Sequence, residues 1–261
     1  METEQTPIET KLESWLTGRR RNSDQSLVRA EAVVRRIVAE RHDRPSLVSQ
    51  IACEIGAEII GGIRQPGGDL NSVELARRYH TSRTPIREAL MLLEKEGLVD
   101  VPPRRRPRVV IHAVSEVREI YRARATLLEL IAGDIARQAP DADIAGLKVP
   151  LAEMQSAYQR GDLESYLWAN VEFHDRNTQI ANNRTVKRII DSLLLRTLPL
   201  RRLSLSQPFR LRDSCDDHVR LVKAYEERDP NLAAALIRSN HMSALATLEA
   251  RLGNNRAAAK S

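Results

Sequence analysis

The sequence contains only two cysteines, Cys53 and Cys215, which lie far apart and belong to no closely spaced motif. A disulfide framework or a thiolate metal site needs several cysteines at regular spacing, so neither is expected here. We predict that both thiols stay reduced and chemically inert, as is usual for proteins of the cytoplasm.

Long apolar runs are also missing. No stretch of eighteen consecutive apolar residues occurs, which argues against a transmembrane helix. The N-terminal segment is polar, carries charges of both signs and lacks the apolar centre of a signal peptide. We therefore expect a cytoplasmic protein with no membrane partner.

Aromatic residues make up only 3% of the chain, whereas leucine, alanine, arginine and glutamate, which favour helices, are abundant. At 261 residues the chain is long enough for two domains with separate cores. The formal charge of +6 is unevenly distributed, because residues 77–108 contain nine Lys or Arg against four Asp or Glu. Such a concentration of positive charge is typical of a nucleic-acid site.

Residues 79–90 predict the turn and second helix of a helix-turn-helix. Ser82 and Thr84 offer hydroxyl groups that can accept the first N–H groups of a helix, and Pro85 fits the first turn. A stripe of apolar residues follows at helical spacing, namely Ile86, Ala89, Leu90 and Leu93.

Arg83 and Arg87 lie four residues apart and therefore share one face near the amino end of this helix. Recognition helices contact bases and phosphates with that end. An ordinary solvated basic face would show the same spacing, so the neighbouring segments have to decide between the two interpretations.

The neighbouring segments favour DNA binding. One helix is predicted after the cap Ser46, and a second begins with a capping box in which Asn71 accepts and Glu74 reaches back. After Leu98, two β-prone segments flank the basic residues 104–106 and predict a hairpin, or wing.

Matching positions at fixed offsets run from the first helix to the wing: Ile59, Gly62, Ile63, Pro66, Gly67, Leu70, Glu74-Leu75-Ala76, Ser82 to Leu90, and Leu93-Glu94-x-Glu96-Gly97-Leu98-Val99. Over residues 46–113 this pattern resembles the winged helix of the GntR family of bacterial transcription regulators. The resemblance implies contacts to operator DNA from the recognition helix, the preceding helix and the wing tip. The residues so assigned are Arg77, Arg78, Ser82, Arg83, Thr84, Arg87, Arg105 and Arg106.

Three positions depart from the family pattern. His80 stands in the turn where the family usually has glycine, and Thr81 replaces a valine. Arg106 replaces the glycine of the wing and is followed by Pro107. We expect backbone strain at position 80, whereas an arginine in the wing can still enter a narrow minor groove.

The second half of the sequence reads as helices only. They are predicted over residues 115–138, 144–161, 162–180, 184–198, 211–228 and 230–252, with a loop at 204–208 and a tail at 255–261. The fold class is therefore mainly α. An extension over residues 1–45, partly disordered and with a helix near 27–40, precedes the winged helix-turn-helix of residues 46–113 and an all-helical bundle of residues 114–254.

Histidines are predicted on three different helices of this bundle. Asn170 and His174 share one face of their helix, and His218 and His241 lie in two later helices. Neutral imidazole is a preferred ligand of Zn²⁺ and Ni²⁺, so these side chains can converge on an ion. Histidines that are simply hydrogen-bonded in the core, or exposed, are the alternative interpretation.

The segments Phe173-His174 and Ala181-Asn182-Asn183, together with His218 and His241, resemble the FCD ligand-binding domain of the FadR subgroup. The resemblance implies a divalent metal, with Zn²⁺ preferred over Ni²⁺ or Mn²⁺, held by these three histidines and Asn170. Asn170 replaces the usual aspartate, and because an amide brings no charge, weaker binding or a different metal preference is expected.

Arg124 resembles the arginine near which effectors of this subgroup place a carboxylate; a surface or dimer-face charge is the alternative. Four further arginines, Arg201, Arg202, Arg210 and Arg212, are expected to be solvated or to line a loop.

Together these features predict a DNA-binding transcription regulator, and more specifically a repressor. It would bind a palindromic operator as a homodimer under the control of a small organic-acid effector. The alternatives are a metal-dependent enzyme that uses the three-histidine site and an effector-free DNA-binding dimer. No side chain stands out as a paired general base, and an enzyme does not explain the wing.

Overall fold

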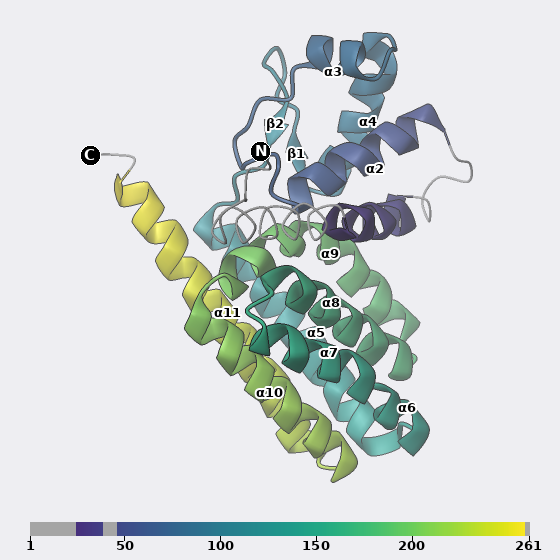
Figure 1. The fold of residues 1–261 in the computed structure, drawn as a ribbon, viewed down its shortest axis with the longest axis vertical. Coiled ribbons are helices and arrows are strands. Elements are labelled where there is room, and N and C mark those ends of the chain that lie inside the picture. The colour runs from purple at the N-terminus through teal and green to yellow at the C-terminus, as the bar shows by residue number, and fades with distance from the viewer. Residues whose placement is uncertain (1–24, 39–45, 259–261) are drawn as a thin grey trace, which may run out of the picture.

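The computed structural model describes residues 25–38 and 46–258, which are mostly helical. The rest of the N-terminal extension and the end of the expected tail lie outside the described residues. Figure 1 shows a small unit at one end of the molecule and a long helical bundle below it, with the helix at residues 25–38 between them. Within the described part of the chain, no helix has the length and apolar character needed to cross a membrane.

The small unit is a winged helix-turn-helix. It consists of α2 (Leu47–Ile60), α3 (Ser72–Arg78), α4 (Arg83–Lys95), β1 (Val99–Asp100) and β2 (Arg108–Val109). The strands pair antiparallel, with Val99 opposite Val109 and Asp100 opposite Arg108, and Asp69 adds a further bridge to Arg108. The predicted helices and wing are confirmed.

Only some of the capping hydrogen bonds predicted at the starts of these helices are formed. The Ser46 hydroxyl accepts from the Ser49 amide at 3.1 Å, and Asn71 caps α3 through its side-chain oxygen. Glu74 does not act as predicted in a capping box; its carboxylate accepts from the Asn71 side-chain amide at 3.1 Å. Ser82 occupies the N-cap position of α4 without a side-chain capping hydrogen bond, so the cap predicted there was wrong.

The turn between α3 and α4 contains the strained residue expected at position 80. His80 adopts φ +49°, in the left-handed region that glycine tolerates and most other residues avoid. The turn is closed by the His80 amide, which donates to the Arg77 carbonyl at 3.2 Å, and by the Thr81 amide, which donates to the Ala76 carbonyl at 3.0 Å. These hydrogen bonds offset a backbone cost of roughly 1 kcal/mol.

The bundle consists of α5 (Val114–Gln138), α6 (Asp141–Gly146), α7 (Lys148–Gln159), α8 (Leu163–Ile180), α9 (Arg184–Leu205), α10 (Pro208–Glu226) and α11 (Pro230–Ala258). The predicted second helix is split at Leu147 into α6 and α7. The last helix continues to Ala258, beyond its predicted end near Leu252.

The loop predicted at 204–208 is shorter than expected, and the helix end predicted at Leu198 was wrong, because α9 continues through Pro199 as far as Leu205. Proline has no amide hydrogen and removes one hydrogen bond of the helix. Leu198, Leu200 and Leu205 are all buried, however, and their burial outweighs the loss of that bond. Only Ser206 and Gln207 connect α9 to α10.

The hydrophobic cores show how the two units are joined. One core lies within the bundle. Another combines the apolar residues of the winged helix with those of the helix at residues 25–38 and with Trp168, Val171, Leu194, Leu195 and Leu198 of α8 and α9. The DNA-binding unit is therefore packed directly against the bundle.

Cys53 and Cys215 are unpaired and buried. Burial raises the pKa of each thiol to about 11. At neutral pH both side chains are therefore protonated and poorly nucleophilic, which is consistent with the inert thiols expected from the sequence.

Candidate DNA interface and bundle pocket

Helix α4 turns its apolar face to the core and its charged face to solvent. All members of its predicted apolar stripe are fully buried, which fixes the orientation of the helix. Arg83 and Arg87 are exposed near its amino end, together with Ser82 and Thr84. No described residue forms an ion pair with either arginine, so both guanidinium groups can bind phosphate or base edges without first losing a partner.

The two arginines of α3 differ in their surroundings. Arg78 forms a short ion pair with Glu58 and lies over the Tyr79 ring, 5.3 Å from its centroid. Burial alone would raise the pKa of Glu58, but hydrogen bonds from Arg78 and Arg64 outweigh it and lower that pKa. Arg78 is thus held by the protein, whereas Arg77 is exposed and better placed for a phosphate contact.

The wing tip carries Arg104, Arg105 and Arg106, all exposed. Arg106 donates to Asp69 at 2.8 Å, so its charge is already paired. Arg104 adopts φ +60°, in the left-handed region. In the family pattern the wing glycine stands two positions later, at Arg106. Among the described residues, Arg105 has no ion-pair partner and is the more available cation of the predicted pair.

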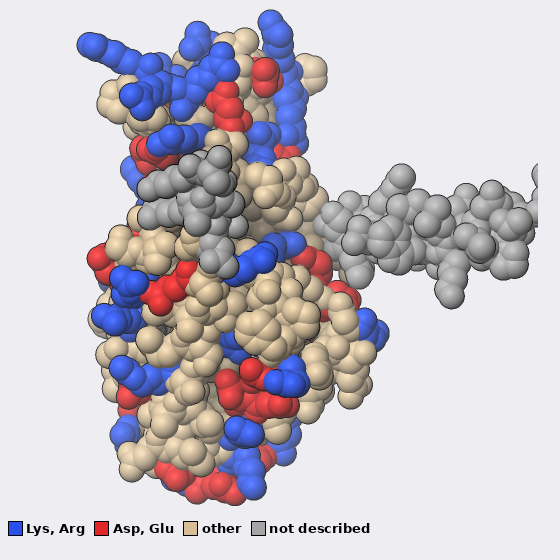
Figure 2. Space-filling view, turned by 90° about the vertical axis from the view of Figure 1, so that its left-hand side faces the viewer, with Lys and Arg blue, Asp and Glu red and all other residues tan. Residues whose placement is uncertain are grey.

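Positive charge gathers around these elements. Figure 2 shows Lys and Arg side chains concentrated over the winged-helix end of the molecule, whereas acidic and basic groups are mixed over the bundle. A field of this kind attracts a polyanion and strengthens each individual phosphate contact.

The bundle brings the three predicted histidines together in its interior. His174 of α8 lies between the other two, with ring centroids 5.2 Å from His218 of α10 and 5.3 Å from His241 of α11. The Nε2 atoms of His174 and His218 are 3.3 Å apart. Asn170 lies one turn before His174, and its Nδ2 is 3.2 Å from His218 Nε2.

The protonation of this cluster follows from its hydrogen bonds. Nδ1 of His218 faces the Ser214 carbonyl at 2.5 Å, and Nδ1 of His241 faces the Ile237 carbonyl at 3.0 Å. A carbonyl oxygen only accepts, so each Nδ1 carries the proton and each Nε2 keeps its lone pair. Burial lowers the pKa of His218 to about 4 and lowers the pKa of His174 and of His241 well below the usual value.

The cluster fits a divalent metal in part. Two nitrogen ligands of a tetrahedral Zn²⁺ lie about 3.4 Å apart, close to the separation of the His174 and His218 Nε2 atoms. Both rings are neutral, as ligands must be. However, within the described residues no group of three or more His, Cys, Asp or Glu is arranged as a ready metal site, and Asn170 contributes no charge.

Three buried arginines surround the histidines. Arg124, Arg201 and Arg210, which come from α5, α9 and α10, are 1%, 8% and 2% exposed. The alternative of a surface charge for Arg124 is therefore wrong, and so is the expectation that Arg201 and Arg210 are solvated. Arg202 and Arg212 instead pair with Glu164 and Asp213 outside the cluster.

The sequence contained a signal that Arg201 and Arg210 are buried, although both are charged. Arg201 follows Leu194 and Leu198 at the spacing of the buried stripe of α9, and Arg210 lies two turns before His218 on α10. Both arginines therefore lie on the buried faces of their helices. A search for apolar residues at helical spacing does not find them, because it leaves arginine out.

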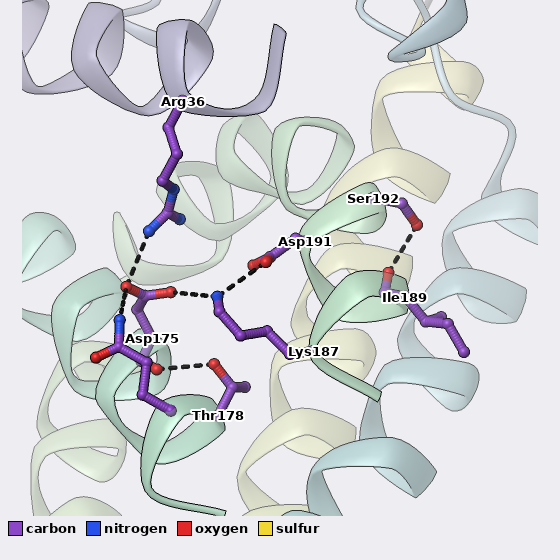
Figure 3. A network of polar contacts seen from close by, with 8 residues as sticks. Arg36, Asp175, Thr178, Lys187, Ile189, Asp191 and Ser192 are labelled. Carbon is purple, nitrogen blue, oxygen red and sulfur yellow. Dashed lines mark hydrogen bonds and ion pairs between the residues drawn. The ribbon is translucent and has the colours of Figure 1, made fainter. Parts of the chain in front are cut away.

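The helix at residues 25–38 connects this bundle to the winged helix. Its Arg36 donates to Asp175 at 2.9 Å, and Asp175 also accepts from Lys187 at 3.2 Å, as Figure 3 shows. The Ser26 hydroxyl donates to Glu164 at 2.7 Å and accepts from the Trp168 indole at 2.9 Å. This bridging helix was predicted, but its contacts to the bundle were not.

These features define the protein as a DNA-binding transcription regulator whose winged helix is joined to an all-helical domain. Residues 47–109 match the model of the bacterial regulatory proteins of the gntR family, and residues 119–244 match that of the FCD domain. The chain belongs to the GntR family and carries an FCD domain. Because the family and its relatives are transcription regulators, the alternative of a metal-dependent enzyme is not supported.

Known relatives agree with this assignment. The chain is 30% identical over 134 residues to the uncharacterized HTH-type transcriptional regulator YdhC of Bacillus subtilis, a match that covers 51% of this chain and 60% of that protein. It is 26% identical to the gluconate operon transcriptional repressor of Bacillus licheniformis, over 76% of this chain and 83% of the repressor. The structure of E. coli McbR/YncC has the same fold, with a TM-score of 0.66 and 23% identity, over 80% of this chain and 99% of that one.

Proposed function

We propose that the protein is a repressor that binds a palindromic operator as a homodimer and releases it when a small anionic effector occupies the bundle. The observation that carries this proposal is the packing of a winged helix, whose α4 exposes arginines, against a bundle whose buried arginines lack acidic partners. The similarity to the gluconate operon repressor supports repression rather than activation.

DNA recognition would use α4. In a symmetric dimer, two such helices enter major grooves about 34 Å apart, one helical turn of DNA, so that protein symmetry matches the palindrome. Arg83 and Arg87 contact bases or phosphates from the exposed amino end of the helix, while Arg77 and Arg105 add phosphate or minor-groove contacts.

The effector would bind in the bundle at Arg124, whose guanidinium can hold a carboxylate through two parallel hydrogen bonds. His174, His218, His241 and Asn170 would hold a divalent cation beside it, with Zn²⁺ as the first candidate. A bound cation would supply additional positive charge toward the same anion.

The bridging helix offers a physical route between the two sites. His174 lines the pocket, and the next residue, Asp175, binds Arg36 of that helix. Likewise Arg201 lines the pocket, and the next residue, Arg202, donates to Glu164 at 2.7 Å, which in turn binds Ser26. A small rotation of α8 or α9 around the effector would therefore shift the bridging helix. Because that helix packs against the winged helix, the position of the winged helix would change as well.

Operator binding can be measured by fluorescence anisotropy with DNA from upstream of the protein's own coding sequence. Arg87→Ala is expected to weaken binding by about five- to 150-fold, since a base or phosphate contact of this kind contributes about 1–3 kcal/mol. Arg220→Ala removes an exposed arginine of the bundle and serves as the matched control. Equal losses in the two variants, or binding that does not respond to salt, would contradict the proposed interface.

Effector control is tested separately, by repeating the titration with carboxylate metabolites, with and without Zn²⁺. Release of the operator by one of them supports the proposal. If no metabolite changes either operator affinity or the melting temperature, the protein is an effector-free DNA-binding dimer instead.

A further inference from the structure

The bundle pocket contains an excess of buried positive charge. The described hydrogen bonds of its arginines go to neutral acceptors only: Arg201 donates to the Asn170 amide oxygen at 3.4 Å, and Arg210 donates to the Asn240 carbonyl at 2.9 Å. Both terminal nitrogens of Arg124 lack a hydrogen-bond partner. Buried charges are normally paired, because removing an ion from water is costly.

The surrounding groups do not neutralise this charge. The pocket histidines are neutral, and the carboxylate of Asp217 accepts from the Asn240 amide at 2.9 Å instead of binding Arg210 directly. Burial, followed by the charge of Arg201, lowers the pKa of Arg124 to about 9, so this guanidinium stays protonated at neutral pH.

Unpartnered hydrogen-bond donors share the same cavity. Six buried donor atoms without a partner belong to residues that line it: the Tyr121 and Ser204 hydroxyls, Arg124 Nη1 and Nη2, and Arg210 Nε and Nη1. Such a set is complementary to a ligand that only accepts hydrogen bonds and is negatively charged.

We infer that this pocket binds a compact oxyanion with at least two negative charges, held by Arg124, Arg201 and Arg210 together. The inference rests on the proposed function, because the pocket is the same effector site, and it names the class of effector. A monocarboxylate would balance only one of the three guanidinium groups, whereas a dianion can bind two of them bidentately and accept from the third.

The size of the cavity limits the ligand. Its volume is about 30 Å³, room for roughly two water molecules, so only a compact ligand suits it, and a phosphate or short dicarboxylate requires the side chains that line the pocket to move apart. A much larger cavity of about 460 Å³ lies between the winged helix and the bundle. Its arginines, Arg64 and Arg202, are already paired with Glu58 and Glu164, so the same argument does not apply there.

Isothermal titration of the full chain, without DNA and with a chelator, tests the inference. Inorganic phosphate and succinate represent the two sources of a dianion, and acetate at matched ionic strength is the monoanion. We expect at least one dianion to bind ten or more times as tightly as acetate. Arg201→Gln should remove that preference, while Arg212→Gln, which alters an exposed arginine paired with Asp213, should leave it unchanged.

Tyr121→Phe provides a milder variant in case Arg201→Gln does not fold. It removes only an unpartnered hydroxyl of the pocket and should weaken binding of the dianion severalfold. Equal affinities for acetate and both dianions, or equal effects of Arg201→Gln and Arg212→Gln, would overturn the inference. Operator binding is measured independently, so a protein that binds its operator but no dianion refutes this inference and leaves the DNA-binding proposal standing.

Discussion

Acid should destabilise the metal-free protein through the buried histidines. His218 is 1% exposed, and burial lowers its pKa from 6.5 to about 4. Between these two values the unfolded chain binds a proton at this site and the folded chain does not. The free energy of unfolding therefore falls as the pH falls through this window, and the stabilising contribution of the neutral form is fully present only above pH 6.5.

The magnitude follows from the two pKa values. Between pH 7.5 and pH 5.0, His218 alone should reduce the free energy of unfolding by about 2 kcal/mol. His174 and His241 act in the same direction, because burial lowers the pKa of each well below the usual value. The loss is large against the 5–15 kcal/mol that stabilises an average domain.

Urea denaturation at both pH values, in the presence of a chelator, measures this loss. His218→Gln cannot be protonated, so its difference in stability between the two pH values should be about 2 kcal/mol smaller than that of the parent protein. His80→Asn removes an exposed histidine and keeps a residue that tolerates positive φ, so it should preserve the parent difference. If His218→Gln and His80→Asn showed the same pH dependence, the assignment of a buried neutral histidine would be refuted.

Further predictions concern the core, the junction and the metal. Leu93→Ala should lower the free energy of unfolding by about 2–5 kcal/mol in urea denaturation, because the side chain is fully buried in the core of the winged helix. Gly97→Ala should cost at least about 1 kcal/mol in the same assay, since position 97 has φ +73° and an added Cβ would meet the Arg196 side chain of α9. Addition of Zn²⁺ should raise the melting temperature of the parent protein more than that of His241→Ala; an equal rise would exclude His241 as a ligand.

The winged helix was predictable because its signals are local. Ile86, Ala89, Leu90 and Leu93 repeat at helical spacing and are all buried, so periodicity alone fixed the orientation of α4. The strain at His80 was predictable from the resemblance, because a turn in which the family usually has glycine imposes positive φ on whichever residue stands there.

Features that depend on distant contacts were missed. Pro199 suggests a helix end, yet the burial of leucines on either side keeps α9 continuous. Arg201 and Arg210 read as surface charges because isolated arginine is costly to bury, and only the packing of several helices shows that both line a pocket. Ser82 was a sound candidate for a cap by residue type, but capping depends on a side-chain rotamer that the sequence does not specify.

The energetics of the pocket suggest how the proposed effector would affect DNA binding at a distance. Unpartnered donors and buried guanidinium groups make the bundle less stable without ligand than a satisfied core would be. An anion that satisfies them binds most strongly to the arrangement of α5, α8, α9 and α10 in which the donors converge, and it shifts the population toward that arrangement. α8 holds the bridging helix through Asp175 and Glu164, and Arg202 of α9 binds Glu164. A shift of α8 or α9 would therefore move the winged helix with it or break these contacts. If the proposed effector acts in this way, one coupling free energy links its binding to operator affinity, and operator DNA should change the affinity for the effector by the same factor.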